Sequence, residues 1–100
     1  MIIVEFSVVP LGTGSTSVSD YVSRACREVE KSGVSYMITP MGTIIETDTI
    51  DKAFEVIKGA HEAVIKAGAK RVSTSIKIDD RRDKERSMED KVKAVKVKRA

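Results

Sequence analysis

The sequence predicts an α+β fold of the ferredoxin-like kind, a βαββαβ arrangement in which two βαβ halves share one antiparallel sheet and place two helices on one face. Two observations predict it. The hydrophobic period changes along the chain in the order strand, helix, strand, strand, helix, strand. The two helical segments also end alike, in Lys31-Ser32-Gly33 and Lys66-Ala67-Gly68, so the halves resemble each other. At 100 residues the chain has the length of a single domain.

The first half opens with a strand over residues 2–9, in which every even position is apolar. Ser17, with Asp20 three residues later, predicts the start of a helix, and Gly33 predicts its end. A second strand covers residues 34–41, Gly42 forms a tight hairpin, and a third strand covers residues 43–47. The apolar stripe of this helix consists of Val18, Tyr21, Val22, Ala25, Cys26 and Val29.

The second half repeats this plan. Asp48 or Thr49 caps a second helix that ends at Gly68, and a fourth strand covers residues 72–78. The stripe of the second helix consists of Ile50, Ala53, Phe54, Ile57, His61, Val64 and Ile65. We therefore expect residues 1–80 to form the domain and residues 81–100 to form a charged helical extension of it.

Within that extension, Ser87 with Asp90 three residues later predicts the start of a short helix. We expect its apolar side chains, Met88, Val92 and Val95, to pack it down.

The single cysteine and the single histidine offer little to metal or disulfide chemistry. Cys26 cannot form an internal disulfide, and its place in an apolar stripe predicts a small buried thiol. His61 also lies on an apolar stripe, which favours a partly buried packing role over that of a ligand or base. No metal or cofactor is therefore expected.

The charge distribution argues against nucleic acid as a partner. Residues 1–78 hold nine basic and nine acidic side chains, whereas residues 79–100 hold nine basic and six acidic ones, so the net charge of +3 comes from the tail. The tail mixes both signs, which is typical of a solvated helix. No stretch approaches the ~18 apolar residues of a membrane span. The N-terminal segment carries Glu5 in its apolar run, unlike a signal peptide, and a cytoplasmic location is expected.

Two short runs, PLGTGSTS at residues 10–17 and PMGT at residues 40–43, recur at strand ends. The first is not a phosphate loop of a known kind, because it has no lysine and no third glycine at position 17. In the predicted topology both runs lie at the same end of the sheet, where they are expected to converge on one pocket. Residue chemistry alone leaves two roles open for the hydroxyls at 15–17, helix capping and contact with a small polar ligand.

The sequence lacks the signatures of other protein classes that share this fold. The third strand has no aromatic residue for RNA stacking, and no CxxC pair is present for metal transfer. Glu5, Glu46 and Asp48 are candidate catalytic carboxylates, but surface carboxylates are the simpler interpretation and no nucleophile or base accompanies them.

Four segments resemble the thiamine-binding protein family, a YkoF-like group. They are VVPLGTGSTSVSDYV, YMITPMGTIIE, KGAHEAVIKAGAKRV and IKIDDRRD, and together they span nearly the whole chain. The resemblance implies a non-enzymatic protein that binds thiamine or its hydroxymethylpyrimidine moiety and associates into dimers and tetramers. It marks Ser15, Thr16, Ser17, Met41, Gly42 and Thr43 as ligand-binding residues, and it leaves residues 78–83 equally consistent with a role at a subunit interface.

The chemistry of thiamine is compatible with these residues. Hydroxyl and backbone groups can read the aminopyrimidine edge, Met41 or Tyr36 can pack on a ring, and Glu46 or Glu5 can balance the thiazolium charge. For Tyr36 and Tyr21, however, core packing is the simpler interpretation. The alternative function is a regulatory or interaction module that binds another metabolite or a protein partner.

One sheet face remains uncovered by the two helices. It is expected to carry Ile3, Glu5, Ser7, Val9 and Lys77. Because this mixture is too apolar to stay fully wet, we expect self-association, either face to face or through an edge strand.

Overall fold

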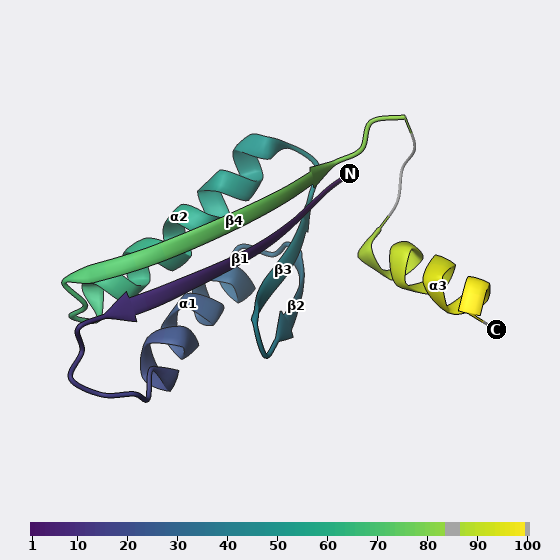
Figure 1. Ribbon diagram of the computed structural model, residues 1–100. Coiled ribbons are helices and arrows are strands. Elements are labelled where there is room, and N and C mark those ends of the chain that lie inside the picture. The colour runs from purple at the N-terminus through teal and green to yellow at the C-terminus, as the bar shows by residue number, and fades with distance from the viewer. Residues whose placement is uncertain (84–86, 100) are drawn as a thin grey trace.

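A computed structural model describes residues 1–83 and 87–99 of the protein, with the side chain of residue 99 excepted. Four strands form one antiparallel sheet in the order β2-β3-β1-β4, which confirms the predicted ferredoxin-like fold. Two helices cover one face of this sheet and a third lies to the side (Figure 1). The elements are β1 (Ile2–Leu11), α1 (Ser19–Lys31), β2 (Ser35–Thr39), β3 (Gly42–Thr47), α2 (Ile50–Lys66), β4 (Arg71–Asp80) and α3 (Met88–Arg99).

The core lies between the sheet and the helix pair α1–α2. Strand β1 pairs with β3 on one side and with β4 on the other, and its even-numbered side chains are buried toward the helices. On β3, Thr43, Ile45 and Thr47 point to the same side and are buried. The buried helical residues are Ala25 and Val29 of α1 and Ala53, Val56, Ile57, Ala60 and Val64 of α2. These side chains form one cluster.

Three of the four predicted ends of α1 and α2 are confirmed by the structure. Thr49 caps α2, since its hydroxyl accepts a hydrogen bond from the Lys52 amide at 3.1 Å. Gly33 and Gly68, which follow the two helices, have positive φ angles of 79° and 115°. The fourth prediction is wrong, because α1 begins at Ser19 and its N-cap, Val18, makes no side-chain hydrogen bond.

The predicted cap, Ser17, lies instead in a loop that is held by its own internal hydrogen bonds. The Ser17 amide donates to the Ser15 hydroxyl at 3.1 Å, and the Thr13 hydroxyl donates to the Ser15 carbonyl at 3.2 Å. Gly12 and Gly14 have φ angles of 71° and 78°. The glycines of PLGTGSTS are therefore explained by left-handed backbone conformations in this loop.

The hairpin between β2 and β3 is also built differently from the prediction. Pro40 and Met41 form the turn, and Gly42 is the first residue of β3. The Thr39 hydroxyl closes the turn, because it accepts from the Met41 and Gly42 amides at 3.2 and 3.1 Å and donates to the Gly42 carbonyl at 2.9 Å. Gly42 is needed for close approach, since a Cβ there would lie 2.8 Å from the Phe6 carbonyl oxygen of β1.

Several side chains that were expected in the core are partly exposed. Phe54 of α2 is 47% exposed and Tyr36 of β2 is 39% exposed, so core packing was wrong for both. Cys26 is half-buried rather than buried. Tyr21 does pack against the core cluster. His61 is half-buried, as predicted, and its Nδ1 lies 2.7 Å from the Thr74 hydroxyl of β4.

The third helix begins as predicted but packs differently. The Ser87 hydroxyl accepts from the Asp90 amide, and the Asp90 carboxylate accepts from the Ser87 amide, both at 3.1 Å. Val92 and Val95 are exposed, so the predicted packing of these two residues is wrong. Polar contacts of Met88 and Lys91 with the sheet attach α3 instead. Residues 84–86 and 100 of the predicted extension lie outside the described residues.

Within the described residues, 1–83 and 87–99, no helix is both long enough and apolar enough to cross a membrane.

The close approach at Gly42 generates a test of the fold with a matched control. We expect Gly42→Ala to lower the free energy of unfolding by about 1–3 kcal/mol, because the added Cβ displaces β3 from β1. Gly59→Ala, inside α2, is the control: its Cβ would meet only Glu28 Cβ at 4.0 Å, and the helix gains from alanine by roughly 0.5–1 kcal/mol. Urea unfolding measures both variants. Equal stabilities for the two would contradict the proposed contact.

Candidate functional site

A groove lies between α1 and the β2–β3 hairpin, on the helix side of the sheet. It exists because β2 has only five residues and α1 packs mainly on α2, which leaves the hairpin tip uncovered. Its floor is formed by Phe6 and Val8 of β1 together with Thr43 of β3. The groove is lined further by Val22, Ala25, Cys26 and Val29 of α1 and by Ile38, Thr39, Pro40, Met41 and Gly42 of the hairpin.

The groove is apolar except for a few polar groups near its floor and wall. Thr43 is 9% exposed, and its hydroxyl makes no hydrogen bond to the described residues. Because no buried side-chain polar atom of those residues lacks a partner, this hydroxyl is accessible from the groove that Thr43 lines. The Thr39 hydroxyl, by contrast, is fully used by the turn. Thr43 therefore offers one free donor and acceptor within an apolar wall, the composition that fixes the orientation of a small ligand.

The groove has a volume of about 190 Å³. A cavity of ~150 Å³ holds a benzene molecule. The space therefore suits one substituted six-membered ring. Met41, which is 85% exposed, stands at the mouth, where its thioether can contact a larger group outside.

The structure brings some of the sequence-predicted residues together and separates others. Met41, Gly42 and Thr43 line the groove, but Ser15, Thr16 and Ser17 do not. The loop and the hairpin do lie at the same end of the sheet. However, β1 pairs with Thr43 at Phe6 and continues to Leu11, so the loop begins roughly 15 Å farther along the strand (Figure 1).

Glu46 lies away from the groove, on the uncovered face of the sheet. It pairs with Ile3 of β1, and its carboxylate accepts a hydrogen bond from the Met88 amide of α3 at 2.8 Å. A second contact joins Lys91 of α3 to the Asp79 carboxylate of β4. These two contacts attach α3 beside the uncovered face, so the structure gives Glu46 a role in holding the third helix.

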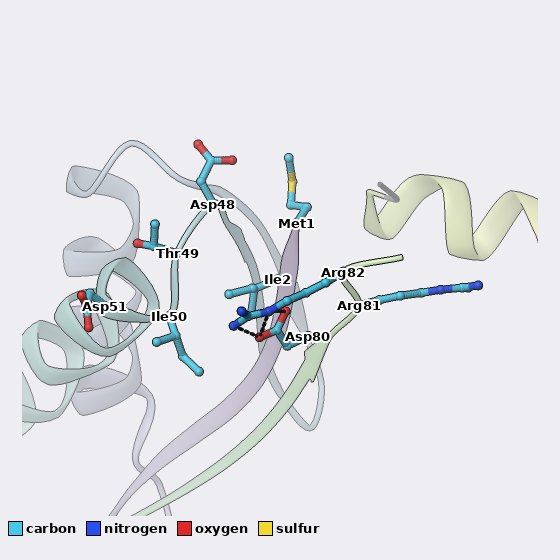
Figure 2. A pocket seen from close by; sticks show the side chains of 9 residues that line it. All are labelled: Met1, Ile2, Asp48, Thr49, Ile50, Asp51, Asp80, Arg81 and Arg82. Atoms are coloured by element: carbon cyan, nitrogen blue, oxygen red, sulfur yellow. Dashed lines mark hydrogen bonds and ion pairs between the residues drawn. The ribbon is translucent and has the colours of Figure 1, made fainter. Parts of the chain in front are cut away.

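A larger cavity of about 470 Å³ lies at the opposite end of the sheet, next to the first turn of α2. Figure 2 shows Arg82 folded onto the Asp80 carboxylate and Arg81 directed away from the cavity. The hydrogen bond from Arg82 lowers the pKa of the Asp80 carboxyl, and its positive charge acts in the same direction. Arg81 pairs with Asp83 at 2.9 Å. Because both guanidinium groups are already paired, this cavity has no free cation from the IDDRRD motif to offer a ligand.

Metal binding has no support in the described part of the chain, where no three His, Cys, Asp or Glu side chains are placed to hold an ion.

Sequence reasoning missed the α1 wall of the groove and the role of Thr39. Val22 and Cys26 follow helical spacing, which cannot distinguish a side chain in the core from one at a groove edge. Thr39 had a detectable signal, because a threonine before proline in Thr39-Pro40-Met41-Gly42 is typical of a turn whose first residue bonds the following amides.

These features define the class of protein: a small ferredoxin-like domain with a ring-sized apolar groove between a helix and a hairpin. The chain matches the family model described as "Thiamine-binding protein" over residues 4–96. It is 51% identical over 98 residues to a UPF0045 protein of Methanothermobacter thermautotrophicus, with 98% of this chain and 99% of that protein covered. The chain therefore belongs to the thiamine-binding protein family, as its motifs predicted.

Solved structures agree on the fold. A hypothetical protein from Methanocaldococcus jannaschii is 39% identical, with a TM-score of 0.87 and 95% of each chain covered. A Thermotoga maritima protein described as a putative thiamine biosynthesis/salvage protein is 21% identical, with a TM-score of 0.78 and coverage of 94% of this chain and 97% of that one. At that identity the second likeness supports the fold alone.

The single cysteine allows the groove to be tested directly. We expect Val22→Trp to slow the reaction of Cys26 with a small thiol reagent several-fold, because the indole fills the space beside the sulfur atom. Val92→Trp, on the exposed side of α3, is the matched control and should leave the rate unchanged. If both variants react at the wild-type rate, Cys26 does not open into the groove.

Proposed function

We propose that the protein binds thiamine or its hydroxymethylpyrimidine moiety in the groove between α1 and the β2–β3 hairpin, without catalysing a reaction. The observation that carries this proposal is the free Thr43 hydroxyl in a ring-sized apolar groove. Membership of the thiamine-binding protein family supports the choice of ligand.

The size of the groove favours the pyrimidine as the buried part of the ligand. A ring-sized volume accepts one of the two rings of thiamine. The aminopyrimidine is neutral and has donors and acceptors on its edge, so Thr43 can bond that edge while Phe6, Val8 and Val22 contact its faces. Burial of the cationic thiazolium in an apolar site would be costly. That ring is therefore placed outside, at the exposed thioether of Met41.

The role of Ser15, Thr16 and Ser17 in this proposal is secondary. Their loop begins beyond the groove and bonds to itself through Thr13 and Ser15. We propose that these residues contact the ligand only if the loop approaches the hairpin when thiamine binds. Glu46 is not needed in the groove, because its carboxylate holds the Met88 amide.

The proposed binding takes place in a homo-oligomer. The uncovered sheet face carries the side chains expected there, with Val9 and Leu11 exposed and Ile3 and Ile44 half-buried. Apolar residues on an open sheet face favour association with another subunit.

A thermal-shift measurement tests the ligand. At a ligand concentration about 100-fold above Kd, we expect stabilisation of ~2.7 kcal/mol, which raises Tm by roughly 10–20 °C in a domain of this size. Thr43→Val keeps the shape of the side chain and removes the hydroxyl, so we expect the folded protein with most of the Tm shift lost.

Thr16→Val is the matched control, because it removes a hydroxyl from the exposed loop. It should keep the full shift. A shift that survives Thr43→Val and is lost with Thr16→Val would move the site to the loop. No shift with either thiamine or hydroxymethylpyrimidine would contradict the proposed ligand and favour the alternative, a module for another metabolite or a protein partner.

A further inference from the structure

Strand β4 is a long sheet edge without a partner in the described chain. It has ten residues, twice the five of the other edge strand, β2, and it contains no proline. Ile76 and Ile78 point to the helix side, since they pair with Phe6 and Val4, yet they are 42% and 36% exposed. An edge of this length, with apolar side chains and open backbone groups, is suited to pairing with another strand.

We propose that β4 pairs antiparallel with β4 of a second copy of this chain, with Ser75 on the two-fold axis. This inference rests on the self-association proposed above and does not depend on the ligand.

Two-fold symmetry restricts the register. An axis that relates two neighbouring antiparallel strands is perpendicular to the sheet, so the helices of both copies lie on the same face. Directly opposed residues of the two strands then lie on the same face of the sheet. The axis must therefore pass at the level of one residue, which pairs with its own counterpart in the second copy, and not midway between two residues.

Among such registers, the one centred on Ser75 opposes side chains of opposite charge and keeps every carboxylate away from an apolar side chain. Arg71 opposes Asp79 of the second copy on the uncovered face, and Lys70 opposes Asp80. Val72 opposes Ile78 and Thr74 opposes Ile76 on the helix face. Lys70 and Arg71 have no ion pair within the described residues, and Asp79 has one carboxylate oxygen that Lys91 does not use.

The two neighbouring registers are less favourable because they place the same residues opposite unsuitable partners. A centre at Thr74 places Arg71 against Lys77. A centre at Ile76 places Val72 against Asp80 and brings Arg71 opposite Arg81. Each alternative sets like charges together or opposes an apolar side chain with a carboxylate, which costs stability.

Helix α2 supplies an independent argument for the same centre. Phe54, His61 and Ile65 lie on one side of α2, and the His61 contact with Thr74 shows that this side faces β4. Phe54 and Ile65 are 47% and 38% exposed. These two apolar side chains have no described partner that covers them.

The position of the axis along α2 follows from the His61–Thr74 contact. Ser75 is one strand residue beyond Thr74, about 3.4 Å. Because α2 runs antiparallel to β4, that distance equals roughly two helical residues back from His61, near position 59. Phe54 and Ile65 lie almost equally far on either side of this level. The two-fold axis therefore brings Phe54 of one copy opposite Ile65 of the other.

Disulfide cross-linking tests the register in a Cys26→Ser background. Directly opposed residues have Cα atoms about 4.5–5.5 Å apart, within the ~4.4–6.8 Å range of disulfides. We expect Ser75→Cys to form a disulfide-linked dimer in a mild redox buffer at low protein concentration. Ser73→Cys is the matched control, since its two introduced thiols would lie four strand residues apart, about 13 Å, and should stay reduced.

Charge reversal gives a second measurement, by sedimentation equilibrium of the full chain. Arg71→Asp should weaken the dimer roughly tenfold, because the two-fold axis places two like-charge contacts in each dimer. Arg71→Asp with Asp79→Arg should restore it. Cross-linking at position 73 in place of 75, or no restoration by the double variant, would overturn the proposed register.

The outcomes separate this inference from the proposals on which it builds. A wild-type oligomer that does not cross-link through Ser75→Cys overturns the edge pairing and leaves association through the open sheet face. A wild-type monomer overturns both the edge pairing and the homo-oligomer. The Tm shift with thiamine is measured separately and decides the ligand in either case.

Discussion

The central strand β1 is the element on which the rest of the structure depends. It pairs with β3 and β4, and its alternation of side chains divides the molecule into a helix side and an uncovered side. Within β1, Phe6 contributes both to the packing of the core and to the shape of the groove. Its side chain is buried in the core and forms part of the groove floor, while its carbonyl oxygen allows only a glycine at position 42 of the neighbouring strand. The groove therefore follows from the packing of the sheet.

The two edges of the sheet differ because their strands differ in length, five residues in β2 and ten in β4. The short β2 leaves space between the hairpin and α1, and this space becomes the groove. The long β4 forms the opposite edge, where Ile76 and Ile78 are partly exposed. The proposed ligand site and the proposed pairing surface therefore lie at opposite edges of the sheet, and the two proposals do not compete for the same surface.

The sequence predicted the strand and helix order because the apolar period in each segment records which face is buried. It could not predict how deeply each side chain is covered, since that depends on neighbouring elements. Phe54 and Val22 follow a helical stripe, yet the first is 47% exposed and the second borders the groove. The same limit applies to the two glycine-containing runs. Their shared end of the sheet followed from topology, but their separation depends on β1 continuing to Leu11, beyond the level of the hairpin.

Amide chemical shifts of the isotope-labelled protein, followed during titration with hydroxymethylpyrimidine, test the central claim most directly. The proposed groove site predicts the largest changes at residues 39 and 41–43 and at residues 22–26, with small changes at residues 13–17 and at Glu46. Changes concentrated in the loop at residues 13–17 or on the uncovered sheet face would contradict it, as would a titration that leaves every amide unchanged.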